Sequence, residues 1–174
     1  MSDLTPALDL LVRTRQALLD RAAAIAPADW GRSPAPGVWA PADLFEHLAL
    51  VERNVERHVL GILFREPAAP ELRAKVREDD RVHRFLSNRN RRVTAPDWVT
   101  PRRKWPEREA ALQAFTGARD ANLAGFRAAP PEPRSYAMAH PFLGVLDGVQ
   151  WGLFLGWHVE RHLAQLDEIT AALA

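Results

Sequence analysis

Two histidines stand four positions apart near the end of the chain, in the stretch GWHVERHLAQLDEI at residues 156–169. At about 100° per residue in a helix, His158 and His162 fall on one stripe. The other members of this stripe are Trp151, Phe154, Leu155, Leu166 and Ile169. Because the stripe is apolar and the charged Glu160 and Asp167 point the other way, we expect both imidazoles to be buried.

A third histidine has a similar setting earlier in the chain, within PADLFEHLALVERNVERH. Helical spacing places His47 on an apolar stripe made of Leu44, Val51, Val55 and Ile62. His58 falls on the same stripe, eleven positions after His47. That separation is roughly 16 Å along a helix axis, so the two side chains should not reach the same ion.

Buried histidines at this spacing suit metal binding. Neutral imidazole is a common ligand of transition metals near neutral pH, and two imidazoles at positions i and i+4 can converge on one ion. A third from a neighbouring helix would leave coordination positions open for water or substrate, as in catalytic sites. The spacing is equally compatible with core histidines that hydrogen-bond to carbonyl groups. It is not the zinc-protease motif HExxH, because Val159 stands where that motif has its glutamate.

The elements that must position these histidines have the periodicity of helices. We expect long helices over residues 5–26, 41–64 and 106–128 and from Asp147 onward, where Asp147 and Gln150 form a capping-box pattern. A less regular helix is expected over residues 70–87, and no segment shows a strand pattern. The chain is therefore predicted to form one all-α domain, a helical bundle with long loops that spans residues 1–174.

Composition excludes several classes of protein. Apolar residues make up 47% of the 174 positions and charged residues 26%, which is typical of a globular domain. The net charge of +1 provides no field to hold a nucleic acid. The absence of cysteine excludes disulfides, thiolate metal sites and a cysteine nucleophile. With no signal-peptide pattern and no membrane-length apolar run, we expect a cytoplasmic protein that does not contact the membrane.

Other polar and aromatic residues have less specific settings. The segment from residue 88 to 105 carries Arg89, Arg91, Arg92, Arg102, Arg103 and Lys104. We expect a solvated loop there, with a grip on an anionic substrate as the alternative. His140 and His83 could approach a pocket, but a loop contact and a half-exposed polar position are the favoured interpretations. Trp39 and Trp157 are expected to be packing residues.

Three stretches of the chain resemble the DinB-like (DinB/YfiT) superfamily of metalloenzymes: PADLFEHL at 41–48, TAPDWVTPRRKWPEREAALQAF at 94–115 and HPFLGVLDGVQWGLFLGWHVERHLAQLDEI at 140–169. The resemblance implies an up-down-down-up four-helix bundle, here with an extra short helix. It also implies a divalent metal held by one histidine of the second helix and two of the last. The matching positions are His47, His158 and His162. Gln165 matches a glutamine that follows the pair and could orient a ligand imidazole, with a buried glutamine bonded to the backbone as the alternative.

The resemblance implies a metal-dependent enzyme that acts on a small molecule. Zinc, nickel and iron are the candidate metals, and a hydrolase or a thiol-dependent S-transferase is the candidate activity. The transferase would use a low-molecular-weight thiol as cosubstrate, since the chain has no thiol of its own. The alternative is a non-catalytic stress or damage-response bundle that acts as a binding or dimerisation module. A homodimer is compatible with either hypothesis, because bundles with exposed helix faces often dimerise.

Overall fold

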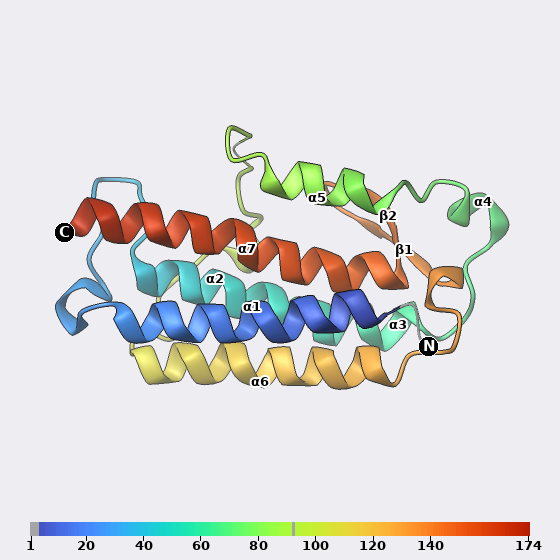
Figure 1. Cartoon of the computed structure of the whole chain (residues 1–174), viewed down its shortest axis with the longest axis horizontal. Coiled ribbons are helices and arrows are strands. Elements are labelled where there is room, and N and C mark those ends of the chain that lie inside the picture. Colours follow the sequence, from blue (N-terminus) through green and yellow to red (C-terminus); the bar gives the residue numbers. More distant parts are fainter. Residues whose placement is uncertain (1–3, 92) are drawn as a thin grey trace.

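Four long helices form the body of the protein in a computed structural model that describes residues 4–91 and 93–174 (Figure 1). They are α1 (Thr5–Ala24), α2 (Pro41–Asn54), α6 (Arg108–Arg127) and α7 (Gly148–Leu173). In Figure 1, α1 and α7 run in one direction while α2 and α6 run in the opposite one. The molecule is thus an up-down-down-up four-helix bundle, as the sequence resemblance implies.

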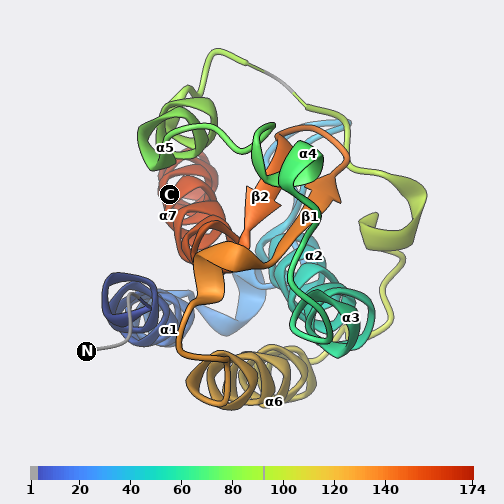
Figure 2. The same cartoon turned by 90° about the vertical axis from the view of Figure 1, so that its right-hand side faces the viewer.

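The first two long helices, α1 and α2, are not neighbours in this bundle, and neither are the last two, α6 and α7. Helices α1 and α2 each pack against both α6 and α7, and the end-on view shows α1 and α2 on opposite sides (Figure 2). The long connection between α2 and α6 allows these two neighbouring helices to run in the same direction. Helix α2 also lies beside α7, and this contact brings the histidine-bearing helices together.

The second helix changes its winding beyond Asn54. A π-helical segment, η2 (Val55–Leu60), leads into the short α3 (Gly61–Leu63). A π-helix holds more residues per turn than an α-helix, so the buried stripe shifts along the sequence. Val59 and Leu63 are buried, whereas His58 is exposed. The prediction that His58 lies on the buried stripe is therefore wrong, because it assumes uniform α-helical spacing.

Smaller elements cover one side of the bundle. The irregular helix expected over residues 70–87 is divided into α4 (Pro70–Arg73) and α5 (Asp79–Ser87), and α5 packs against α7. Strands β1 (Ala137–His140) and β2 (Gly144–Asp147) form an antiparallel hairpin that the sequence does not predict. Three 3₁₀ helices, η1 (Pro27–Asp29), η3 (Asp97–Val99) and η4 (Pro133–Ser135), complete the described loops.

The last helix begins as predicted. Asp147 accepts a hydrogen bond from the backbone N–H of Gln150 at 2.8 Å, and the Gln150 side chain accepts one from the Asp147 N–H at 3.3 Å. This reciprocal cap fixes where α7 starts, and so fixes which of its residues face the core.

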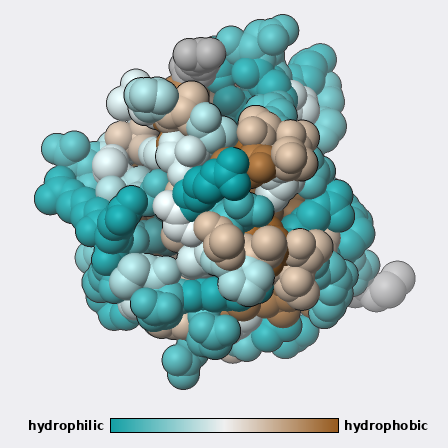
Figure 3. Space-filling view, turned by 90° about the vertical axis from the view of Figure 1, so that its left-hand side faces the viewer, coloured by the Kyte–Doolittle hydropathy of each residue, from teal (hydrophilic) through white to brown (hydrophobic). Residues whose placement is uncertain are grey.

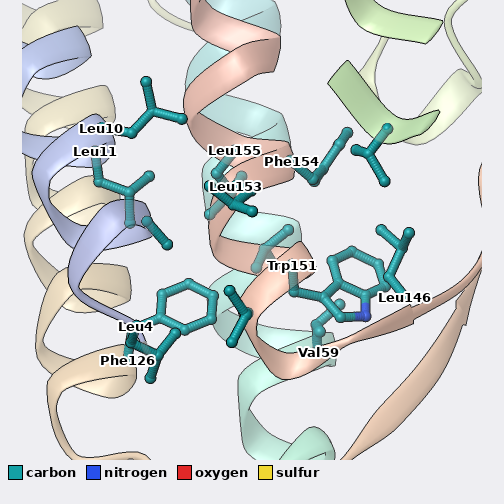
Figure 4. Close-up of a cluster of buried hydrophobic side chains, with 14 of the residues drawn as sticks. Leu4, Leu10, Leu11, Val59, Phe126, Leu146, Trp151, Leu153, Phe154 and Leu155 are labelled. Carbon is teal, nitrogen blue, oxygen red and sulfur yellow. The ribbon is translucent and has the colours of Figure 1, made fainter. Parts of the chain in front are cut away.

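The apolar core consists of two clusters with a polar layer near their junction. The first cluster joins α1, α6 and α7 to the hairpin and extends along α7 as far as Leu155 (Figure 4). The second cluster includes α7 residues from Val159 onward. His158 therefore lies at the boundary of the two clusters, while His47 and His162 lie among residues of the second cluster.

One end of the bundle has a mostly hydrophilic surface. Hydrophilic residues surround a smaller hydrophobic area at the end where α1 finishes and α2 and α6 begin (Figure 3). Among the residues that the structure describes, none of the helices combines the length and hydropathy needed to cross a membrane.

Helices α1 and α7 approach each other closely at Gly156, where an added methyl group would overlap Cγ and Cδ2 of Leu10. We expect Gly156→Ala to lower the free energy of unfolding by about 1–3 kcal/mol, as overpacked cores do. Gly117→Ala is the matched control, because Gly117 is exposed within α6 and nothing lies within 4 Å of an added Cβ. That change should raise stability by about 0.5–1 kcal/mol. Urea denaturation measures both, and a stabilising Gly156→Ala would contradict the close approach.

Candidate metal centre

Three imidazole nitrogens converge between α2 and α7. Nε2 of His158 lies 3.4 Å from Nε2 of His47 and 3.1 Å from Nε2 of His162. The ligand atoms of the three residues all fall within 4.8 Å of one another. The structure therefore brings together the three histidines that the sequence pattern singles out. His47 and His162 are buried, and His158 is partly buried.

The local sequence explains how these side chains meet. His158 and His162 are one turn apart on α7, which is continuous through this region. On α2, Pro41 occupies the first turn, and Asp43 accepts a hydrogen bond from the Ala40 N–H at 2.9 Å. This start sets the register of α2, so that His47 faces α7 about 1.7 turns later.

In two of the histidines, the second ring nitrogen, Nδ1, forms a hydrogen bond on the side away from the centre. Nδ1 of His47 donates to the backbone carbonyl of Val99 at 2.8 Å, and Nδ1 of His162 donates to Oε1 of Gln165 at 2.9 Å. An oxygen acceptor requires the proton on Nδ1, which leaves the Nε2 lone pair directed into the centre. Gln165 thus contacts a candidate ligand, whereas the contact of Val99 with His47 is one that the sequence does not reveal.

This donor set fits a divalent cation. In the neutral state His47 and His162 carry their protons on Nδ1, so only Nε2 of His158 can carry a proton into the centre. At least two of the three Nε2 atoms therefore present lone pairs that repel each other. A cation placed among them would turn that repulsion into three bonds. Tetrahedral Zn–N bonds of about 2.0–2.1 Å hold their nitrogens roughly 3.3–3.4 Å apart. The observed separations of 3.1 and 3.4 Å are close to this value.

Burial keeps the three imidazoles in the neutral form that binds metals. It lowers the pKa of His47 to about 4, and the hydrogen bond to Val99 opposes this only in part. Burial is also the largest cause that lowers the pKa of His158 and of His162 well below 6.5, and the charges of neighbouring histidines add to it. All three side chains are therefore neutral near pH 7.

These pKa values predict an acid-sensitive fold in the metal-free protein. Burial lowers the pKa of both His47 and His140 to about 4 in the folded chain. Between pH 6.5 and about 4, the unfolded chain therefore binds a proton at each of these two histidines, and the folded chain does not. The free energy of unfolding should then fall as the pH falls through this window. Urea midpoints measured at about pH 7 and about pH 5 test this. An unchanged or higher midpoint at the lower pH would contradict it.

Aromatic rings line the centre on two sides. Trp39 lies 5.0 Å from the His47 ring and 6.4 Å from the His162 ring, between ring centroids. On the other side, Phe154 lies 5.5 Å from the ring of His158. Trp39 is partly buried and packs against the second apolar cluster, as expected of a packing residue, and two of its ring neighbours are candidate ligands.

The basic segment contacts two different helices. Arg89 pairs with Glu168 on α7, while the backbone N–H groups of Arg102 and Lys104 each donate to the buried carboxylate of Glu46 on α2 at 2.7 Å. Glu46 thereby holds the segment that carries the Val99 carbonyl behind the site. Arg92 lies outside the described residues.

The two remaining histidines near α7 differ in their surroundings. His83 is exposed and lies 5.1 Å from the Trp157 ring, in keeping with a polar surface position. His140 ends strand β1, and its ring lies 4.5 Å from that of Phe154 and 5.3 Å from that of Trp151. His140 is thus next to the aromatic side of the centre.

Comparisons with known proteins agree with this architecture. The family model of the DinB superfamily matches residues 10–166. The solved structure of TT2238, described as a four-helix bundle protein, has 25% identity and a TM-score of 0.61, and the match covers 95% of this chain and 98% of that one. YfiT from Bacillus subtilis, described as a probable metal-dependent hydrolase with an unusual four-helix bundle topology, has 13% identity and a TM-score of 0.64. That match covers 99% of this chain and 90% of YfiT. No curated protein matches the chain.

Proposed function

The chain belongs to the DinB superfamily, and on this premise we propose that it is a metal-dependent enzyme whose ion is held by His47, His158 and His162. The observation that carries the proposal is the convergence of three Nε2 atoms. In His47 and His162 the ring proton is fixed on Nδ1, so that Nε2 is free to bind an ion. A purely structural group of core histidines would be expected to pair each nitrogen with a protein donor or acceptor instead.

The protein residues have separate tasks in this proposal. Val99 and Gln165 hold two imidazoles in the orientation that ligation requires, and Trp39 and Phe154 exclude water from the sides of the centre. Such outer contacts raise the basicity of ligand imidazoles and typically matter for metal affinity by about tenfold or more. Three protein ligands leave coordination positions free, which is typical of catalytic rather than structural sites.

The reaction class follows from the donor set. A divalent ion bound by three neutral imidazoles supplies a Lewis acid that lowers the pKa of a bound water or thiol. Hydrolysis of a small molecule is one candidate, and the description of YfiT supports it. Transfer of a low-molecular-weight thiol is the second candidate, and the chain's lack of cysteine would require that thiol to come from solution. Zinc, nickel and iron are all compatible with nitrogen ligands.

Elemental analysis of protein purified without a histidine tag tests the proposal. We expect about one equivalent of a divalent transition metal per chain, with its coordination completed by solvent. Protein that stays metal-free after incubation with zinc, nickel and iron, and that keeps its fold and stability, would favour the binding or dimerisation module instead.

A cobalt-substituted protein distinguishes the two reaction classes. If a thiol binds the ion, a small thiol should produce a sulfur-to-cobalt charge-transfer band in the near ultraviolet, because thiolate is a soft ligand that donates charge to the metal. Titration with the thiol at neutral pH gives its affinity. An unchanged spectrum at saturating thiol would contradict thiol transfer and leave hydrolysis as the candidate.

A further inference from the structure

His140 is held in one tautomer by its own hairpin turn. Its Nδ1 lies 3.2 Å from the backbone N–H of Phe142 and 3.3 Å from that of Leu143. Both partners are donors, so Nδ1 must present its lone pair, and the proton of the neutral ring resides on Nε2. Burial lowers the pKa of His140 to about 4, which keeps the ring neutral near pH 7. The residue is therefore a fixed hydrogen-bond donor through Nε2.

The ring of His140 lies beside α7, against two of the aromatic residues of that helix. Nδ1 is turned back to the hairpin, so the opposite edge of the ring, with Nε2, points away from the turn. The ring packs edge-to-face against Phe154, at 4.5 Å between centroids. Phe154 precedes His158 by one helical turn and touches its ring at 5.5 Å.

The hydrogen bonds within residues 4–91 and 93–174 include none from Nε2 of His140, although both backbone contacts fix its other nitrogen. We propose that His140 donates a hydrogen bond from Nε2 to a small molecule bound at the coordination positions that the three-histidine centre leaves free. The inference rests on the proposed metal centre. The fitting ligand has a metal-binding atom and, a few bonds away, a carboxylate or carbonyl oxygen that accepts the hydrogen bond.

Two thiols that differ in this acceptor test the proposal on cobalt-substituted protein. 3-Mercaptopropionate carries a carboxylate beyond the sulfur, and 1-propanethiol does not. We expect His140→Phe to weaken 3-mercaptopropionate binding about tenfold or more, as loss of a hydrogen bond to a charged group does, and to leave 1-propanethiol affinity unchanged. Phenylalanine keeps the contact with Phe154. His140→Gln, which retains a side-chain N–H donor, should restore part of the affinity.

Metal content separates this inference from the proposed function. His140→Phe should retain the same cobalt stoichiometry as the wild-type protein, because position 140 is not a ligand. His83→Phe is the matched control, since His83 also lies beside α7 and should not affect either thiol. Equal affinities in wild type and His140→Phe, or equal losses for both thiols, would overturn the inference while the metal centre stands. A wild-type protein that takes up no cobalt would overturn the proposed function and this inference together.

Discussion

Replacement of His158 or His162 by alanine is expected to reduce bound metal to a small fraction of the wild-type content without unfolding the protein. Each change removes one of three imidazoles, and the two that remain offer too few donors to retain a transition metal against solvent. The fold should survive because two apolar clusters across four helices hold it, unlike a zinc finger that folds only with its metal. Elemental analysis and far-ultraviolet circular dichroism measure the two effects. His47→Ala should behave in the same way.

His58 provides a control on the same helix. It is exposed beyond the start of the π-helical segment, roughly 16 Å along the axis from His47. His58→Ala should therefore keep full metal content and, since the side chain is at the surface, wild-type stability. Full occupancy in both His47→Ala and His162→Ala would contradict the assignment of the site.

The candidate ligands can be found from the sequence because they lie where helical spacing is uniform. His47 belongs to the α-helical part of α2, and His158 and His162 belong to an unbroken α7. The same reasoning fails for His58, because the π-helical segment changes the number of residues per turn. The letters VERHVL include ordinary helix-forming residues and carry no sign of that change.

Tertiary contacts explain what else the sequence does not predict. The hairpin has strands of only four residues, too short for an alternating pattern to stand out, and His140 binds its own turn through backbone groups. Val99 contributes a carbonyl oxygen, which any residue possesses. Periodicity predicts four long helices, but their up-down-down-up order comes from family resemblance, because helix patterns alone do not determine which faces meet.

A buried ionic network links the four helices. The side chain of Arg119 on α6 is fully buried and pairs with Glu52 on α2, which is 1% exposed. Arg119 also donates to the Leu11 carbonyl at 2.8 Å and to Thr14 at 3.0 Å on α1, and Asn122 donates to the Glu52 carboxylate at 2.7 Å. A charged residue on a helix normally lies at the surface, so sequence patterns give no reason to expect this pair.

Glu52→Leu should lower the free energy of unfolding by about 3–5 kcal/mol, because it leaves the Arg119 guanidinium buried without its counter-charge. For a domain whose total stability is about 5–15 kcal/mol, this loss removes a large share of the folding energy. The double change Glu52→Leu with Arg119→Met removes both charges, and it should recover most of the loss. Urea denaturation of the two single variants and the double variant completes a double-mutant cycle.

An exposed pair is the control for this cycle. Arg21 on α1 and Asp167 on α7 are bonded at 2.7 Å, but both side chains are 51% exposed. Solvent screens such a pair, so Asp167→Ala should change stability by less than about 1 kcal/mol. Similar losses for Asp167→Ala and Glu52→Leu would mean that burial does not set the energy of the Arg119 pair. A double variant no more stable than Glu52→Leu would mean that the loss comes from disrupted packing rather than from an uncompensated charge.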